Sequence, residues 1–237
     1  MSWKRPENVG FPQIWLTFDA KDPDTGKIVK YRVQDLPEDR FPEALHLMAT
    51  EFLRDETMCK SLELINDPNV NGKDIWLGLL MQKISVVCFK EGSDEICGMN
   101  ILEVLEKDVK EPEEKIESVK VQNLLKAMNF IKTQADPYNK HNVDKYLHAM
   151  GLLVLPKYRG LGLATEILRA RVPLGKALGL KMTGTVFTGI ASQKNAAKAG
   201  FVDEYTVYYE DLGKKEPFVV FPNVTSPQVK FMSLRFD

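Results

Sequence analysis

The stretch LPKYRGLGLATEIL, residues 155–168, joins an apolar run to a segment with helical spacing. Gly160 and Gly162 stand at alternate positions within it, and glycine permits backbone conformations and close approaches that other residues cannot adopt. Backbone N–H groups at the start of a helix bind anions directly, and the helix dipole favours negative charge there. We therefore predict that this loop binds a large anionic group such as a pyrophosphate.

Two common phosphate-binding loops are excluded by the residues that flank these glycines. The dinucleotide-binding pattern G-x-G-x-x-G needs glycine at Thr165 and an acidic residue near Phe187, where the next strand should end. The P-loop pattern needs serine or threonine after a Gly-Lys pair, whereas Ala177 follows Gly175-Lys176. The pattern that remains is Arg-x-x-Gly-x-Ala.

Hydrophobic periodicity on both sides of the loop predicts an alternation of strands and helices. Strands are predicted at residues 14–18, 27–36, 75–90, 95–105, 146–156, 181–188, 203–212 and 229–236. Helices are predicted in two segments over 38–65 that meet near 54–56, and at 121–131, 163–180 and 192–200. Pro173 predicts a kink around Arg169, and the charged run at 106–118 predicts a solvated loop. We expect one α/β domain over residues 1–237, with a mixed central sheet flanked by helices.

Composition and charge exclude several classes of protein. The 237 residues are 44% hydrophobic, which is enough for a sizeable core, and a formal charge of −1 argues against a general grip on nucleic acid. No apolar run reaches the roughly 18 residues of a membrane span, and the first residues lack the apolar core of a signal peptide. Three cysteines without a CxxC pair give no metal-site pattern, so no metal is expected. We expect a cytoplasmic monomer with free thiols and no nucleic-acid or membrane partner.

The loop resembles the acetyl-CoA signature of the GNAT superfamily of N-acetyltransferases. Arg159, Gly162 and Ala164 fill its Arg/Gln-x-x-Gly-x-Gly/Ala pattern, and Gly200-Phe201 matches a Gly-Phe pair that follows in the family's order of elements. The resemblance implies a single-domain GNAT fold in which the middle strands of the mixed sheet splay apart. It also implies acetyl-CoA as the co-substrate.

The same resemblance assigns parts of the domain to the two substrates. The cofactor core is expected at about residues 146–201, and the acceptor side at about 31–70 and 202–237. The pyrophosphate is expected on the N–H groups of residues 157–164, and the pantetheine arm along the preceding strand. A backbone N–H of residues 153–155 is expected to stabilise the charge that develops on the thioester oxygen. The cofactor-binding residues are then Leu153, Val154, Leu155, Lys157, Tyr158, Arg159, Gly160, Leu161, Gly162, Leu163, Ala164 and Thr165.

More narrowly, the chain is similar to the insect arylalkylamine N-acetyltransferases. Those enzymes have a glutamate after the first helix as the proposed general base, and Glu56 takes its place, with Thr57 where the family has proline. Thr188 and Ser192 match two hydroxyl residues of the family, and Ala196 stands where many superfamily members place a tyrosine acid. The resemblance implies acetyl transfer to a primary amine of the dopamine, serotonin, tyramine or octopamine type.

Acetyl transfer to an amine needs a base, because an alkylamine with a pKa near 10 is only about 0.1% neutral at pH 7. Glu56 is the first candidate. His148 is the second, because imidazole titrates near neutrality and vertebrate members resemble this chain there; a structural histidine is the alternative. Ser192 or Thr188 could protonate the departing thiolate, although both residue types commonly cap helices. No cysteine has a recognisable base partner, so we expect direct attack in a ternary complex.

Other functions stay open from the sequence alone. A polyamine or protein-lysine acetyltransferase of the same fold would place carboxylates along its acceptor channel, whereas an aryl pocket needs apolar and aromatic walls. A non-catalytic acyl-CoA-binding protein could keep the loop and lose turnover. The candidate wall residues are Phe52, Met58, Phe187, Tyr208 and Phe218.

Overall fold

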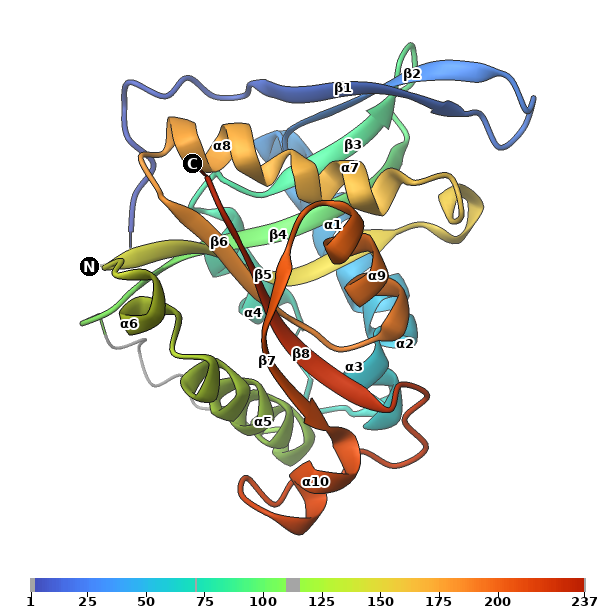
Figure 1. The fold of residues 1–237 in the computed structure, drawn as a ribbon. Helices are drawn as coiled ribbons and strands as arrows, with labels where there is room; N and C mark the ends of the chain where they lie inside the picture. Colours follow the sequence, from blue (N-terminus) through green and yellow to red (C-terminus); the bar gives the residue numbers. More distant parts are fainter. Residues whose placement is uncertain (1–2, 71, 110–115, 237) are drawn as a thin grey trace.

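An eight-stranded sheet forms the centre of the computed structural model, which describes residues 3–70, 72–109 and 116–236 (Figure 1). Its order is β1-β2-β3-β4-β5-β6-β8-β7, and neighbouring strands are antiparallel except for β5 and β6. The predicted mixed α/β architecture is confirmed. The strands are β1 (Ile14–Lys21), β2 (Ile28–Asp35), β3 (Val86–Lys90), β4 (Ile96–Glu106), β5 (Lys145–Val154), β6 (Met182–Phe187), β7 (Val202–Tyr208) and β8 (Gln228–Arg235).

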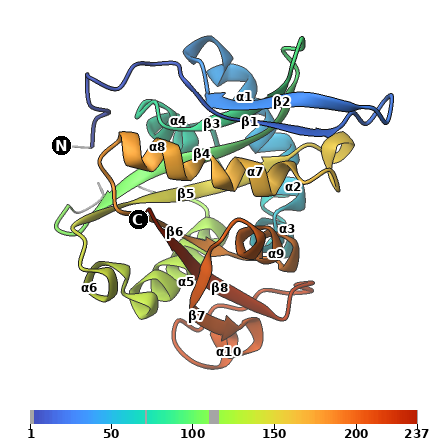
Figure 2. The same ribbon diagram turned by 45° about the horizontal axis from the view of Figure 1, so that its top comes forward.

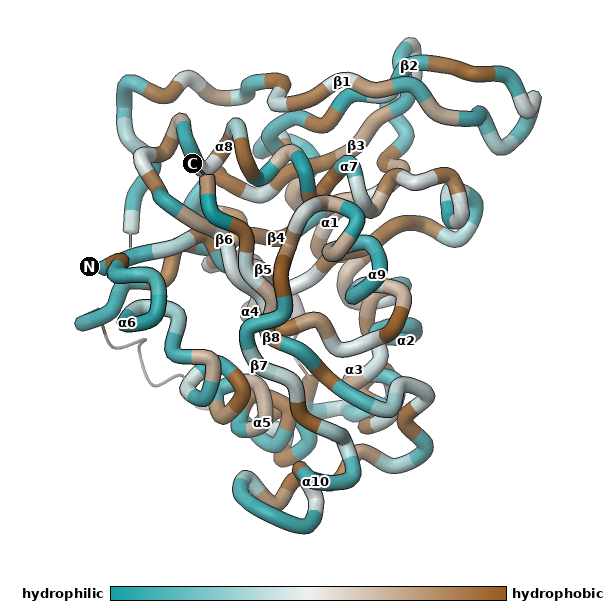
Figure 3. The backbone as a smooth tube through the Cα atoms, in the orientation of Figure 1, coloured by the Kyte–Doolittle hydropathy of each residue, from teal (hydrophilic) through white to brown (hydrophobic). Residues whose placement is uncertain are grey.

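Helices cover both faces of this sheet (Figure 2). One face carries α7 (Leu163–Arg169) and α8 (Arg171–Ala177), whose apolar stripe packs on β1 to β5. The other face buries a larger core beneath α5 and the helices that precede β3 in the chain. The tube through the central strands is mostly hydrophobic (Figure 3). No helix in the described ranges is long and apolar enough to cross a bilayer. The other helices are α1 (Phe41–Leu47), α2 (Leu53–Asp55), α3 (Thr57–Ser61), α4 (Gly72–Leu80), α5 (Val119–Ala135), α6 (Pro137–His141), α9 (Ile190–Lys198) and α10 (Tyr209–Lys214).

The two parallel strands β5 and β6 form a fork. They pair at Leu147 and Thr183 and diverge beyond that point, which confirms the expected splay of the middle strands. In β5 the register with β4 shifts near Gly151, which has a φ of +153°. A Cβ on Gly151 would lie 2.4 Å from the Met48 Cε atom and 3.4 Å from the Phe52 ring, and the positive φ would strain any other residue. Glycine therefore suits the close approach of β5 to the π-helical turn Met48–Phe52. The fork therefore opens toward the carboxyl ends of β5 and β6.

Residues 72–80 form helix α4, so the predicted strand at 75–90 is wrong over its first half. Trp76 and Leu80, four residues apart, are both buried, whereas Leu77 between them is 42% exposed. This is the spacing of a helix that buries one face. The composition of this apolar run is typical of a strand, whereas the spacing of its buried residues is that of a helix. Short apolar runs do not distinguish a strand from a helix by sequence alone.

Smaller differences concern the ends of elements. The predicted strand at 203–212 ends at Tyr208, and α10 begins at Tyr209. The long helix at 163–180 divides at Ala170 into α7 and α8, next to Arg169, where the sequence predicts a kink. Pro173 lies in the first turn of α8, where a missing N–H breaks no helical bond. The charged loop predicted at 106–118 lies partly outside the described residues, which omit 110–115.

Candidate active site

A groove of about 930 Å³ lies between the glycine loop and α9, at the open end of the fork. Most of the predicted cofactor-binding residues line it: Val154, Tyr158, Arg159, Gly160, Gly162, Leu163, Ala164 and Thr165. Asn195 and Lys198 of α9 and Thr225 before β8 also line it, and the sequence did not single them out, because the positions of these segments beside the loop are a tertiary property. The groove therefore brings together two segments that are separated in the sequence.

The glycines of the loop have the backbone conformation that their residue type allows. Gly160 has a φ of +79° and Gly162 a φ of +87°, and a Cβ on either would meet open space. The constraint is therefore the positive φ rather than packing. The helical hydrogen bonds of α7 begin at the Gly162 carbonyl, which accepts from the Thr165 N–H at 3.0 Å. The N–H groups of residues 160–164 precede this ladder and remain available to an anion. Those of Tyr158 and Arg159, within the predicted range 157–164, already donate to the Leu155 and Pro156 carbonyls.

Four predicted cofactor residues lie outside the groove lining. Leu153 is buried in the core, and Leu161 packs on the apolar face beneath α7. The Lys157 ammonium pairs with the Asp24 carboxylate at 2.9 Å, at the tip of the β1–β2 hairpin. The Leu155 N–H donates to the Cys97 carbonyl of β4 at 3.0 Å, so this N–H is already paired.

The unpaired edge of β5 follows from that bond. In an antiparallel ladder, alternate residues bond to the same neighbour, so Leu152 and Val154 direct their N–H groups away from β4. Both residues line the groove. The Val154 carbonyl accepts from the Arg159 Nε at 3.0 Å. Leu152, which the sequence did not single out, therefore joins Val154 as a backbone donor at the open side of the fork.

Arg159 also ties the glycine loop to the segment before α3. Its Nη2 donates to the Asp55 carboxylate at 2.7 Å. Asp55 directly precedes Glu56, and both residues line the groove. The ion pair thus connects the loop to the predicted base through adjacent residues.

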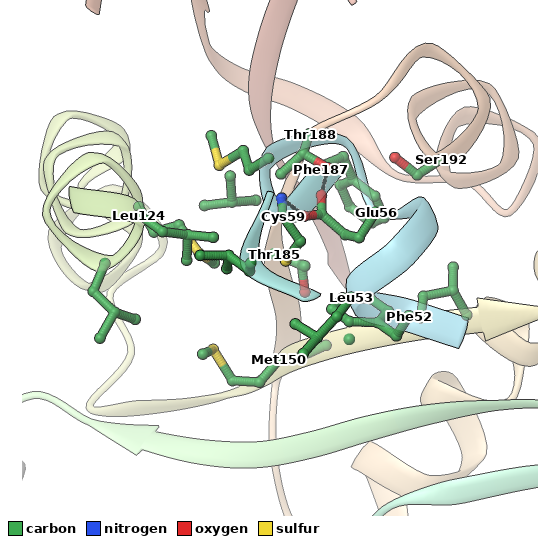
Figure 4. A pocket seen from close by; sticks show the side chains of 18 of the residues that line it. Phe52, Leu53, Glu56, Cys59, Leu124, Met150, Thr185, Phe187, Thr188 and Ser192 are labelled. Carbon is green, nitrogen blue, oxygen red and sulfur yellow. Dashed lines mark hydrogen bonds between the residues drawn. The ribbon is translucent and has the colours of Figure 1, made fainter. Parts of the chain in front are cut away.

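A second cavity, the acceptor cavity, encloses about 140 Å³ next to the groove (Figure 4). Its walls come from α5, from β5 and β6, and from the segment between Phe52 and Trp76, and they are mostly apolar. Of the predicted wall residues, Phe52, Met58 and Phe187 line it, whereas Tyr208 and Phe218 are exposed elsewhere. The residues shared by the cavity and the groove are Phe52, Glu56, Leu152, Thr188 and Ser192.

Glu56 lies at this junction because the chain breaks there between two helical segments. Its ψ of 138° ends α2 and makes it the N-cap of α3, where its Oε2 accepts from the Cys59 N–H at 2.8 Å. Thr57 begins α3 at the position of the family proline, so the turn is formed without proline. The Thr188 hydroxyl donates to the Glu56 Oε1, and these two side chains lie together in Figure 4. The carboxylate is therefore held at both oxygens.

The two hydroxyl residues have different surroundings. The Tyr209 hydroxyl donates to the Thr188 carbonyl at 2.8 Å, which fixes the residue that contacts Glu56. The Ser192 hydroxyl donates to the Gly189 carbonyl at 2.8 Å, as a residue in the first turn of α9. Ala196 is fully buried against the core beneath α9. A tyrosine at that position would have no room in this packing.

His148 lies away from both cavities, inside the sheet. It is fully buried, and its Nδ1 lies 2.8 Å from the Gly184 carbonyl, which it contacts as a donor. Burial lowers its pKa to about 3, so the imidazole is neutral at physiological pH. These surroundings agree with the alternative given from the sequence, in which His148 is a structural histidine.

The three cysteines are buried free thiols. Cys59 lines the acceptor cavity, and burial together with the neighbouring Glu56 carboxylate raises its pKa well above the usual range. Burial also raises the pKa of Cys88 and of Cys97. A thiol that stays protonated is a poor nucleophile, which agrees with the expectation of direct transfer.

Arg171 is a lining residue that the sequence interpretation missed. It lines the acceptor cavity and is fully buried, although arginine is rarely buried without a partner. One signal was present in the sequence. Arg171 follows the buried Ile167 by four positions and precedes the buried Leu174 by three, so the helical period places it on the apolar stripe of its helix.

Comparison with solved structures identifies the family. Arylalkylamine N-acetyltransferase 7 from the yellow fever mosquito Aedes aegypti matches with a TM-score of 0.95 and 43% identity, over 99% of this chain and 100% of that chain. Arylalkylamine N-acetyltransferase 2 from Aedes aegypti matches with a TM-score of 0.75 and 19% identity, over 87% of this chain and 99% of that chain. A polyamine N-acetyltransferase from Drosophila melanogaster has a TM-score of 0.72 and 18% identity, over 86% and 99% of the two chains.

The two more distant matches establish a shared fold, and the 43% match establishes more because it covers both chains almost completely. No family model and no curated protein sequence matches the chain. The fork and the glycine loop described above are the features that the resemblance to this superfamily implied. The chain is therefore an acyltransferase that belongs to the insect arylalkylamine N-acetyltransferase family within the GNAT superfamily.

Proposed function

We propose that this enzyme transfers an acetyl group from acetyl-CoA to the primary amine of an arylalkylamine of the dopamine, serotonin, tyramine or octopamine type. One observation carries the proposal: a groove with backbone donors and an apolar cavity meet at the Glu56 carboxylate. A phosphate-bearing thioester suits the groove, and an aromatic amine suits the cavity. The reacting groups of both would then meet beside a base.

The groove suits acetyl-CoA, which supplies an activated acetyl thioester when bound. The N–H groups of the glycine loop would hold the pyrophosphate, and Lys198 adds positive charge at the groove lining. Arg169 also lines the groove, but its guanidinium pairs with the Glu166 carboxylate there. The N–H groups of Leu152 and Val154 would bind the pantetheine arm and the thioester oxygen. Leu155 is not assigned to that task, because its N–H already bonds to Cys97.

Glu56 is the proposed general base. It is half-buried at the junction, and it accepts hydrogen bonds from the Cys59 N–H and the Thr188 hydroxyl. These bonds orient the carboxylate toward the place where the amine loses its proton. His148 has no part in this proposal, because it lines neither cavity and its pKa is low.

Ser192 and Thr188 are the hydroxyl residues that line both the groove and the acceptor cavity. Either hydroxyl, or a water molecule, can supply the proton that the departing thiolate takes up. A free thiol has a pKa of about 8.5, so the thiolate is a good leaving group and needs little help. Both hydroxyls already donate, Ser192 to the neutral Gly189 carbonyl and Thr188 to the Glu56 carboxylate. Ser192 is the better donor of the two, because a hydrogen bond to a neutral carbonyl costs less to give up than one to a charged group.

The walls of the acceptor cavity favour an apolar amine over a polyamine. Among the described lining residues, Glu56 is the carboxylate, and the fully buried Arg171 guanidinium is the opposing charge. A second ammonium group would lack a carboxylate partner and would face this cation, which is unfavourable in a buried site. An aromatic ring can pack on Phe52, Trp76 and Phe187.

A substrate panel tests the proposal. Thiol release from acetyl-CoA is measured with dopamine, serotonin, tyramine, octopamine, histamine, spermidine and a lysine peptide. We expect the aromatic amines to have the highest kcat/KM values. A higher kcat/KM for spermidine or for the lysine peptide would contradict the assignment of the acceptor. We also propose that the enzyme acts as a cytoplasmic monomer, which gel filtration and fractionation of cells can check.

A further inference from the structure

Arg171 reaches the acceptor cavity from α8 and is held by neutral partners. Its Nε donates to the Asn100 Oδ1 at 2.8 Å, and its Nη1 donates to the Thr185 Oγ1 at 2.8 Å and to the Thr183 Oγ1 at 3.3 Å. The guanidinium also lies 5.6 Å from the centre of the Phe201 ring. None of these partners carries a negative charge.

One nitrogen of this guanidinium has no partner. The Nη2 atom is buried and finds no hydrogen-bond acceptor among the described residues. Burial lowers the pKa of Arg171 to about 9, so the group stays cationic at neutral pH. A buried charge without a counter-charge is strongly unfavourable, and a guanidinium offers donors only.

Thr185 completes the local arrangement. Its Oγ1 accepts from Arg171, so its hydroxyl hydrogen can point to a further acceptor. Thr185 and Arg171 both line the acceptor cavity, and both are buried, whereas Glu56 and Ser192 at the junction are half-buried. In Figure 4, Thr185 lies on the side of the cavity toward Met150, away from Thr188. The donors of Arg171 and Thr185 therefore belong to the inner end of the cavity.

We propose that Arg171 and Thr185 form an anion subsite at the inner end of the acceptor cavity. The preferred amine then carries a carboxylate, or a comparable anionic group, at the end remote from its amino group. This inference rests on the proposed function, because it takes the cavity to hold the acetyl acceptor. It adds a second recognition element to the apolar walls: the amine faces Glu56, and the anion faces Arg171.

A series of three amines tests the subsite. The probes are 2-phenylethylamine, tyramine and 4-(2-aminoethyl)benzoate, which share one skeleton and differ at the ring position remote from the amine. We expect kcat/KM to rise along the series, with the carboxylate roughly 10- to 1000-fold above 2-phenylethylamine, because a buried donor left unpaired penalises the analogue that lacks the acceptor. A ratio of one or less in the natural enzyme would overturn the proposal.

The variant Arg171→Met separates recognition from structure, since it keeps an unbranched stem and removes the charge and the donors. A subsite predicts that the preference for the carboxylate disappears while 2-phenylethylamine is still acetylated. A merely structural role predicts that kcat/KM falls by the same factor for all three amines, and that result would also overturn the proposal. Arg235→Met, which removes an exposed arginine outside both cavities, serves as the control.

Binding measurements keep the test independent of turnover and of the stability of the variant. If the natural enzyme acetylates none of the three amines, the proposed function fails, and calorimetry then decides the subsite alone. 4-(2-aminoethyl)benzoate should bind at least about tenfold more tightly than 2-phenylethylamine to the natural enzyme. Equal affinities would contradict the subsite. If Arg171→Met does not fold, Thr185→Val replaces it, and a preference that is unchanged in this variant removes Thr185 from the subsite.

Discussion

The groove and the acceptor cavity meet at Glu56 but are built in different ways. The glycine loop offers the groove backbone groups from a contiguous stretch, and their positions depend on the positive φ of Gly160 and Gly162. The cavity is enclosed by side chains from segments as distant as Phe52, Leu124 and Phe187. A site made of backbone groups tolerates many side chains but few backbone conformations. A site made of side chains depends instead on the identity of each residue that lines it. Substitutions in the first should therefore affect the common co-substrate, and substitutions in the second should affect the choice of amine.

The largest effect is expected at the junction. Glu56→Gln keeps the shape and the hydrogen-bonding capacity of the side chain but removes its basicity, so the rate should fall by roughly 10²–10⁴ while acetyl-CoA affinity persists. The loss should shrink toward high pH, because an alkylamine with a pKa near 10 then deprotonates unaided. Steady-state rates from pH 6 to 10 and calorimetry with acetyl-CoA measure both effects.

Glu51→Gln is the matched control for that experiment. Glu51 lies five residues before Glu56 in the sequence, pairs with Arg54 and lines neither cavity, so this variant should have a normal rate. A near-normal rate for Glu56→Gln at neutral pH would remove Glu56 from the mechanism. Water alone would then be the acceptor of the proton.

The next largest effect tests the backbone character of the groove. Gly162→Val forces a β-branched residue to a φ of +87°, so the loop should change conformation and acetyl-CoA affinity should fall by more than about tenfold. Gly179→Val is the control, since Gly179 has a φ of +70°, equally open space, and no place in the groove lining. Both variants should lose similar stability, and only the first should lose affinity in calorimetry. Undiminished affinity in a folded Gly162→Val protein would show that the loop is not the phosphate site.

A smaller effect is expected where a cavity side chain orients the base. Thr188→Val removes the hydroxyl that donates to Glu56. A hydrogen bond to a charged group contributes about 1.5–3 kcal/mol, and we expect only part of it to act on the transition state, so kcat should fall roughly 3- to 30-fold. Thr188→Ser keeps the hydroxyl and should restore most of the rate. Equal rates for the valine and serine variants would mean that the bond to Glu56 does not contribute to catalysis.

The smallest effect concerns the connection between the two sites. Asp55→Asn breaks the ion pair with Arg159, whose side chains are 34% and 46% exposed, so its contribution is only about 0.2–1 kcal/mol. We expect the KM for acetyl-CoA to rise by at most about fivefold, with an effect that vanishes at high salt. A salt-independent loss would indicate instead that Asp55 positions Glu56 through the backbone.

The two sites also differ in how far the sequence could predict them. The loop was predictable because its glycines, its arginine and its helix are adjacent in the chain, and eight of the twelve predicted cofactor residues line the groove. Leu155 was assigned as a donor because the sequence does not show which N–H groups face β4. The hydrogen bond from the Leu155 N–H to the Cys97 carbonyl shows that this group faces β4.

The acceptor cavity was predictable only in part, because its walls depend on packing between distant segments. Glu56 and Thr188 were identified as separate residues by the resemblance, but 132 positions separate the two that form a hydrogen bond. Helix α4 was taken for a strand, so Trp76 was not recognised as a wall residue. Arg171 was overlooked because an arginine in a helix usually lies in solvent, and its neutral partners lie on β4 and β6.

The fork between β5 and β6 leaves an exposed strand edge within the protein. Such edges invite pairing with strands of other molecules and so promote aggregation. Here the edge beyond Leu147 and Thr183 is recessed, with Leu152 and Val154 in a groove that the glycine loop and α9 border. A slender extended chain can reach these N–H groups, but the edge of a second sheet is too bulky to enter. The recess that would admit the extended cofactor arm in the proposed function is therefore also expected to keep this open edge from pairing with the sheet of a second molecule.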